Sequence, residues 1–215
     1  MTDRTHQPPI RKPEHMVLHR PERVVWPNGV PLSVLRAGDN EVVRIDVLME
    51  GGRWHQHYPL QALFANRMLR EGTRRYTAAQ IAERLDYYGA WLDLSSGAEH
   101  AFVTLYSLNK YLPQTLDVLE SLVKEPLYPQ AELATVVANN VQQFKVNLQK
   151  VDFLAHRGLV STLYGDAHPC GRLAMEADYS RITPELLHDF YRRHYHAAGC
   201  SVYVSGKVAD DCLRR

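Results

Sequence analysis

The sequence LQALFANRMLREGT, residues 60–73, predicts one amphipathic helix near the centre of the fold. Its apolar residues recur at the spacing of a single helix face, at Leu60, Leu63, Phe64 and Met68. The pattern stops at Gly72, a residue well suited to end a helix. We therefore predict a helix that ends at Gly72.

Strand and helix patterns continue on both sides of this helix. Before it we expect a hairpin and a third strand, together three antiparallel strands, at Val24–Trp26, Leu32–Leu35 and Val42–Met49. After it we expect a helix at Thr77–Tyr88, capped by Thr77, and two strands at Trp91–Leu94 and His100–Leu108. Three further helices follow, at Leu112–Lys124, at Gln130 to about Leu163, and from Thr183 onward. A last strand at Ser201–Gly206 closes the domain. This order predicts an α+β fold, with helices packed on one face of a mostly antiparallel sheet.

The stretch that follows the first helix carries a family resemblance. The helix and the following GTRRYTAAQIAERLDYYGAWLDLSSGAEHAFVTLYSL resemble the insulinase/pitrilysin family of zinc metallopeptidases. In that family the first helix carries H-x-x-E-H before a similar M-L-x-x-G-T. The resemblance covers about residues 23–207. It implies one peptidase-like domain over 23–215, the N-terminal part of a longer chain or assembly, behind an extended, proline-rich arm at 1–22.

The positions that match the family's metal motif hold no metal ligands. The resemblance places Leu63, Asn66 and Arg67 at the two histidines and the glutamate, and Asn140 at a later glutamate, or Asn139 if the register slips. A different register cannot restore the site, because residues 59–99 contain no His and residues 133–151 contain no Asp or Glu. Catalytic zinc needs three protein donors and an open position. We therefore expect no catalytic residues, no metal ligands and no zinc.

Two interpretations of these degenerate positions remain open. Asn66, Asn139 and Asn140 are either exposed polar positions on helices or a hydrogen-bonded cluster that replaces the metal site. Arg67 either fills the vacated pocket or points outward as a solvated charge.

Other clusters of reactive residues give weaker signals. The pairs His55/His57 and His194/His196 each place two imidazoles two residues apart, but no carboxylate or cysteine follows at a recognisable spacing. Ser95 and Ser96 with His100 lack a nucleophile elbow. Neither group predicts a site.

The resemblance also implies a peptide-binding edge. Active members of the family hold substrate as an added β-strand, and GAWLDLSSGAEHAF resembles the edge that does so, with main-chain groups of Leu92, Asp93, Leu94 and Ser95 available for pairing. The alternative is an ordinary edge strand protected by Asp93 and by a partner domain.

Composition narrows the classes of function. With 25 basic and 24 acidic residues among 215, the formal net charge is +1, which argues against a nucleic-acid or anionic-membrane partner. No apolar run approaches a membrane span, and the N-terminus lacks the apolar core of a secretory signal. We expect a cytoplasmic protein, or a periplasmic one if a signal was removed. Cys170, Cys200 and Cys212 lack C-x-x-C spacing and are predicted to be free thiols.

Together these features predict a non-catalytic homologue of zinc peptidases. By the precedent of the family, it would close a peptide chamber with a homologous zinc-bearing subunit or domain and help to hold an extended peptide; a homo-oligomer is also compatible. The alternatives are an active metalloendopeptidase with nonstandard ligands and a purely structural assembly domain.

Overall fold

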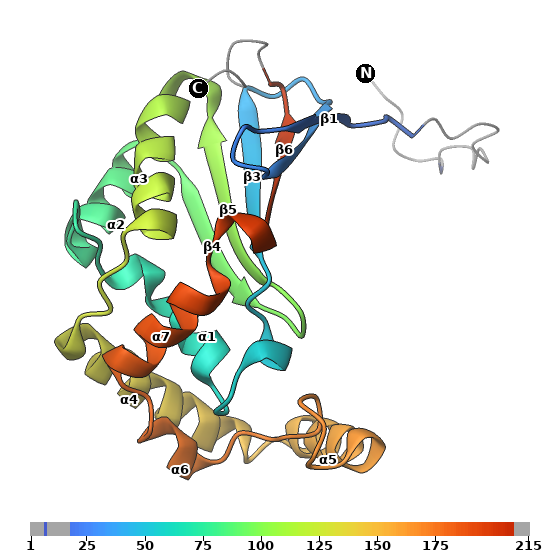
Figure 1. Ribbon diagram of the computed structural model, residues 1–215, viewed down its shortest axis with the longest axis vertical. Helices are drawn as coiled ribbons and strands as arrows, with labels where there is room; N and C mark the ends of the chain where they lie inside the picture. Colours follow the sequence, from blue (N-terminus) through green and yellow to red (C-terminus); the bar gives the residue numbers. More distant parts are fainter. Residues whose placement is uncertain (1–6, 8–17, 209–215) are drawn as a thin grey trace.

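A six-stranded sheet forms the centre of the protein (Figure 1). The computed structural model describes residue 7 and residues 18–208. The strand order across the sheet is β1-β2-β6-β3-β5-β4. The strands span Glu22–Val25 (β1), Pro31–Arg36 (β2), Val42–Met49 (β3), Trp91–Ser96 (β4), Ala101–Leu108 (β5) and Cys200–Gly206 (β6).

Four of the five strand pairings are antiparallel, as the sequence predicts, but the order of the strands was not foreseen. β1 and β2 form the expected hairpin, with Gly29 at φ +84° in its turn. β3 does not continue this hairpin, because β6 lies between β2 and β3, parallel to β2 and antiparallel to β3. The three predicted strands therefore alternate in direction as expected, but β3 is not the neighbour of β2. Periodicity identifies strands but carries no information on which strands pair.

The helices cover one face of the sheet (Figure 1). Side chains of β3 alternate accordingly: Val43, Ile45, Val47 and Met49 are buried, whereas Arg44 is exposed. The covering helices are α1 (Gln61–Arg67), extended by the 3₁₀ turn η2 (Met68–Glu71), α2 (Ala78–Tyr87), α3 (Leu112–Lys124) and α7 (Pro184–His194). This arrangement confirms the α+β prediction.

Helix boundaries follow the capping residues that the sequence indicated. Thr77 accepts a hydrogen bond from the Gln80 amide and forms a capping box with it at the start of α2, and Gly89, at φ +61°, follows the end of α2. Thr183 caps α7 in the same way through the Leu186 amide. These caps confirm the predicted starts of both helices.

The predicted long helix from Gln130 is two helices. α4 spans Gln130–Asn147 and α5 spans Val151–Tyr164, with an extended Lys150 between them. No Gly or Pro marks this break, so the helical pattern runs through it. A short helix α6 (Glu176–Tyr179) and three 3₁₀ turns complete the chain: η1 (Arg53–His55), η3 (Asn109–Tyr111) and η4 (Ala197–Gly199).

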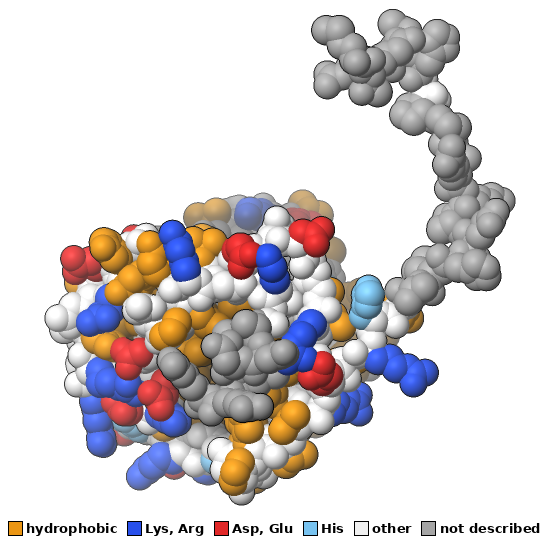
Figure 2. Space-filling view, turned by 90° about the horizontal axis from the view of Figure 1, so that it is seen from above, with side chains coloured by type: hydrophobic (Ala, Val, Ile, Leu, Met, Phe, Trp, Pro, Cys, Tyr) orange, Lys and Arg blue, Asp and Glu red, His pale blue; other side chains and the backbone are white. Residues whose placement is uncertain are grey.

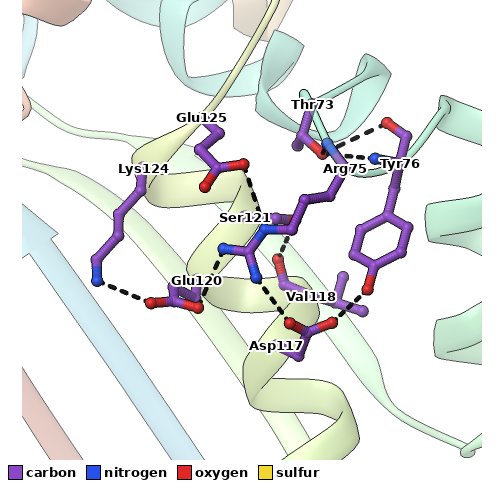
Figure 3. A network of polar contacts seen from close by, with 9 residues as sticks. All are labelled: Thr73, Arg75, Tyr76, Asp117, Val118, Glu120, Ser121, Lys124 and Glu125. Atoms are coloured by element: carbon purple, nitrogen blue, oxygen red, sulfur yellow. Dashed lines mark hydrogen bonds and ion pairs between the residues drawn. The ribbon is translucent and has the colours of Figure 1, made fainter.

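An ion-pair network fixes the loop that follows η2 against α3 (Figure 3). The Arg75 guanidinium contacts Asp117 at 2.7 Å, Glu120 at 3.0 Å and Glu125 at 3.2 Å. The Tyr76 hydroxyl donates to the same Asp117. Because this loop joins η2 to α2, the network holds both elements in place beside β4, where the candidate site lies.

One face of the molecule carries charges of both signs (Figure 2). On the face that Figure 2 shows, basic and acidic side chains of the described residues are interspersed. No described helix is both long and apolar enough to cross a membrane. Cys170 and Cys200 are free thiols, whereas Cys212 and most of the predicted arm at residues 1–22 lie outside the described residues.

Candidate functional site

The structure brings Arg67 and Asn140 together. Arg67 ends α1, and its guanidinium donates a hydrogen bond to Oδ1 of Asn140 on α4. The Asn140 amide nitrogen donates in turn to the Val136 carbonyl at 2.7 Å, which directs Oδ1 toward Arg67. Both side chains are half-buried. Of the two interpretations of Arg67, the structure supports the one in which it occupies the vacated pocket.

Asn139, the other possible register, does not join this contact. It is exposed on α4, whereas Asn140 one residue later faces α1. The structure thus places Asn140, and not Asn139, opposite the helix with the degenerate motif.

Asn66 has a different role from Asn140. It is 1% exposed and donates its amide to the Phe102 carbonyl of β5 at 3.2 Å. It therefore joins α1 to the sheet and is not an exposed helix position. Leu63, one turn before Arg67, is half-buried and contributes no polar group.

The next turn of the helix reaches the edge of the sheet. Arg70 donates to the main-chain carbonyl of Leu92 on β4 at 3.1 Å. Among the strands of residues 18–208, β4 pairs only with β5 and is therefore an edge strand. This contact places the degenerate helix alongside the strand that resembles the family's peptide-binding edge.

The hydrogen-bond register decides which groups of β4 are free. The Gly97 amide donates to the His100 carbonyl at 2.8 Å, and bonded and non-bonded pairs alternate along an antiparallel ladder. Asp93 and Ser95 therefore pair with β5 through their main chains. The main-chain N–H and C=O groups of Leu92, Leu94 and Ser96 point to the open edge of the sheet. The available pairing groups are those of alternate residues and not of the whole Leu92–Ser95 stretch.

A groove of about 530 Å³ follows this edge. Its walls come from α1 with η2, from α2 and from β4, and its lining includes Arg67, Arg70, Glu71, Leu92 and Leu94. Burial raises the pKa of Glu71, against an opposing effect of Arg70 and a reinforcing effect of Glu132 on α4. The groove thus joins the degenerate motif and the free strand edge in one site.

The donors at the motif do not fit the zinc ion that the resemblance implies. Arg67 stays cationic and presents only donors to a ligand, and the oxygen of Asn140 already accepts from Arg67. Within the described residues, no group of three or more His, Cys, Asp and Glu side chains is placed to hold a metal ion. The side chains at the motif therefore support no catalytic step through zinc.

Histidines from the two H-x-H pairs meet elsewhere. The rings of His55 and His194 lie 5.2 Å apart, whereas His196 accepts a hydrogen bond from the Gly199 amide at 3.3 Å. Burial lowers the pKa of His194, with a smaller effect of the same sign from His55. The contact is a packing contact between α7 and η1.

The serines near His100 form no catalytic arrangement. Among the described residues, no hydrogen bond joins His100 to Ser95 or Ser96, and the charged neighbour of His100 is Glu99, at 3.9 Å. The structure thus supports no nucleophilic site at these serines.

Two residues of the groove were missed by the sequence argument. Arg70 lies three residues after Arg67 and Glu71 lies four after it, so both share its side of the helix. That spacing could have identified both residues from the sequence. The hydrogen bond from Arg70 to a main-chain carbonyl could not be predicted, because it depends on where β4 lies.

The helix α1, whose motif positions hold no metal ligands, lies beside the edge strand β4, and this arrangement is that of a peptidase-like α+β domain. Residues 55–173, more than half of the chain, match the family described as Insulinase (Peptidase family M16), and the chain therefore belongs to that family.

Known relatives agree with this assignment. The mitochondrial-processing peptidase subunit alpha of Solanum tuberosum is 23% identical over 152 residues, which are 69% of this chain and 29% of the relative. The crystal structure of a peptidase M16 inactive domain from Pseudomonas fluorescens superposes with a TM-score of 0.83 at 22% identity and covers 90% of this chain. A putative M16-like peptidase from Alicyclobacillus acidocaldarius gives a TM-score of 0.79 at 14% identity and covers 93% of this chain. The chain spans 48% and 49% of these two solved structures, respectively.

Proposed function

We propose that this chain is a non-catalytic domain of the insulinase family that holds an extended peptide along the free edge of β4. The observation that carries the proposal is the groove that joins the Arg67–Asn140 pair to the outward main-chain groups of Leu92 and Leu94. The guanidinium of Arg67 and the amide of Asn140 lie at the motif positions, and the groove beside them leaves the edge of β4 open.

Pairing by main-chain groups explains how binding can outlast catalysis. An added strand gains its affinity from backbone hydrogen bonds, which need no particular side chain in the edge strand. Arg70 occupies the Leu92 carbonyl, so the amide of Leu92 and both main-chain groups of Leu94 are the groups left for a peptide. A peptide that displaced Arg70 would gain one further acceptor.

A homologous, zinc-bearing peptidase domain is the partner that we propose. The relatives include a processing-peptidase subunit called alpha and a domain described as inactive, and this chain spans about half of each matched solved structure. α5 adds an exposed apolar surface: none of its residues is buried, and its Leu159 and Leu163 side chains are 56% and 68% exposed. A surface of this kind fits a stable protein partner.

Peptide binding tests the edge directly. A fluorescent, strand-forming peptide is titrated against the chain, and Leu94→Pro is compared with Val25→Pro. Both prolines remove an outward amide from an edge strand, but Val25 lies in β1, at the opposite edge of the sheet. We expect Leu94→Pro to weaken binding by about tenfold or more and Val25→Pro to leave it unchanged.

A second arm of the test removes donors from the peptide. N-methylation of alternate peptide residues should abolish binding in one register and spare it in the other. Equal binding by both methylated peptides, or by both proline variants, would refute edge pairing, and failure of every peptide to bind would favour a purely structural domain. Stoichiometric zinc with peptide turnover would instead favour a peptidase with nonstandard ligands.

A further inference from the structure

The groove beside β4 contains a cation that no described acidic group neutralises. Arg67 is half-buried, and its side-chain partner is the neutral amide of Asn140. It forms no ion pair with any described residue. A carboxylate at position 140 would have neutralised this guanidinium, but the sequence provides an amide. We infer that Arg67 is a recognition site for a carboxylate carried by the bound peptide, an inference that rests on the peptide-binding function proposed above.

Two contacts give the place of Arg67 along the strand edge. Asn66 contacts Phe102, which pairs with Ser95, and Arg70 contacts Leu92. Arg67 lies between these two residues on the same helix, and Arg67 and Leu94 line the same groove. A peptide paired with the free groups of Leu94 therefore passes the guanidinium.

None of the acidic residues that line the groove forms an ion pair with Arg67. The charges that act on the Glu71 pKa are those of Arg70, which opposes the rise that burial causes, and Glu132, which reinforces it. Asp86 and Asp93 also line the groove, but both are exposed, and Asp93 stands on the strand face opposite to Leu92 and Leu94. The neighbours of Arg67 on the far side are Asn140 and Tyr179, and burial raises the pKa of Tyr179 against an opposing effect of Arg67. No carboxylate from these elements reaches the guanidinium.

Strand geometry makes the recognition positional. Side chains of an added strand alternate between the two faces of the sheet, and α1, which ends at Arg67, is one of the helices that cover one of these faces. An acidic residue should therefore be favoured at one peptide position and at the positions two residues away, but not at the position between. Half-burial strengthens the contact, because a hydrogen-bonded charge pair screened from water exceeds an exposed pair.

The test compares peptides of one length, N-acetylated and C-amidated, with Glu or Gln at the central position. Fluorescence anisotropy measures their affinities for the chain and for three variants. We expect the Glu peptide to bind about tenfold more tightly than the Gln peptide, with a preference that falls as salt is raised. Arg67→Met should remove the preference while the Gln peptide keeps its affinity within about twofold.

Asn140→Asp gives a second variant that keeps the guanidinium. The new carboxylate would pair with Arg67 within the chain, so this variant should also lose the preference for Glu. Arg23→Met is the matched control, because it removes one positive charge from β1, at the opposite edge of the sheet, and should leave the preference unchanged. A Gln peptide with a free C-terminus shows whether a chain end can supply the carboxylate.

The outcomes separate this inference from the proposed function. Equal binding of the Glu and Gln peptides together with no gain from a free C-terminus, or a preference that survives Arg67→Met, would overturn the inference while edge binding stands. Failure of every peptide to bind would overturn both. A gain with the free C-terminus that depends on Arg67 would assign the carboxylate to a chain end, whereas a gain with Glu alone would assign it to a side chain.

Discussion

The guanidinium of Arg67 on α1 donates to the side-chain oxygen of Asn140 on α4, across the site where the family resemblance places a histidine and a glutamate. A hydrogen bond between two side chains thus joins the two helices. The Asn140 amide is held in turn by the Val136 carbonyl at 2.7 Å, so the direction of the bond is fixed.

This pair should contribute measurably to stability. In a double-mutant cycle with Arg67→Met and Asn140→Ala, we expect a coupling energy of about 0.5–1.5 kcal/mol, the ordinary net value of a partly exposed hydrogen bond. Urea denaturation of the four proteins measures it. Asn139→Ala, at the exposed neighbouring position, is the control and should change stability by less than about 0.7 kcal/mol. A coupling energy near zero would show that the contact does not hold the helices.

Restored ligands should bind zinc without restoring catalysis. Leu63→His, Asn66→Glu, Arg67→His and Asn140→Glu together rebuild the family's motif, and the contact between positions 67 and 140 shows that their side chains can meet. The surrounding groups that orient ligands are not rebuilt, and their loss commonly costs about 10- to 100-fold in affinity or activity. We expect weak, pH-dependent zinc binding and no turnover near ~1 per second.

Elemental analysis and zinc-dependent stability check this expectation. The unchanged chain should carry no stoichiometric zinc, because Leu63, Arg67 and Asn140 offer it no competent donor. A variant with the three ligand substitutions but without Asn66→Glu keeps the hydrogen bond from the Asn66 amide to the Phe102 carbonyl. We expect this variant to be more stable than the variant with all four substitutions. One zinc per unchanged chain, bound at α1, would contradict the non-catalytic interpretation.

Local signals predicted the elements of the fold better than their partners. The caps at Thr77 and Thr183 and the glycine at Gly89 define helix ends through short-range hydrogen bonds and backbone conformation, so the sequence contains them. The insertion of β6 between β2 and β3 depends on long-range pairing, which no local pattern encodes. The break at Lys150 lacks the residues that usually mark one.

The candidate site divides in the same way. The absence of ligands at Leu63, Asn66, Arg67 and Asn140 is a property of residue identity, and the sequence is sufficient to show it. The contact of Arg67 with Asn140 joins residues on two helices far apart in the chain, and the separate role of Asn66 depends on the position of β5. Both therefore required the fold.

His194 should make the fold sensitive to acid. Its ring packs 4.5 Å from Phe190 and 5.2 Å from His55, and its Nε2 is buried without a partner among the described residues. Burial lowers its pKa below the ordinary 6.5, with smaller contributions of the same sign from His55, Arg193 and His196 and an opposing one from the Glu50 backbone. Below pH 6.5 the unfolded chain therefore binds a proton that the folded chain does not, and stability falls.

Urea midpoints between pH 5 and pH 8 measure this effect. We expect the midpoint of the unchanged chain to fall as the pH drops below about 6.5, and that fall to be smaller in His194→Gln, which cannot take up the proton. His156→Gln, at an exposed position of α5, is the control and should keep the slope of the unchanged chain. Identical slopes in the unchanged chain and His194→Gln would refute the assignment.

α5 should bury its outer face against a homologous domain. Phe153 and Arg157 attach the helix to Phe144, whereas Val151, Leu154, Leu159 and Leu163 are 81%, 48%, 56% and 68% exposed. These residues lie along the whole length of α5, and Figure 1 shows α5 standing away from the sheet. A second copy of the chain can cover this apolar surface when no other partner is present, so we expect concentration-dependent association in sedimentation velocity.

Leu159→Glu should weaken this association by about tenfold or more, because a carboxylate replaces a side chain whose burial contributes roughly 1.5–3 kcal/mol. Gln114→Glu introduces the same group at an exposed position of α3, on another helix of the domain, and should leave association within about twofold. Equal effects of the two variants would show that charge alone weakens association. A chain that stays monomeric at concentrations on the order of 100 μM, and does not bind a zinc-bearing homologue, would contradict the role of α5.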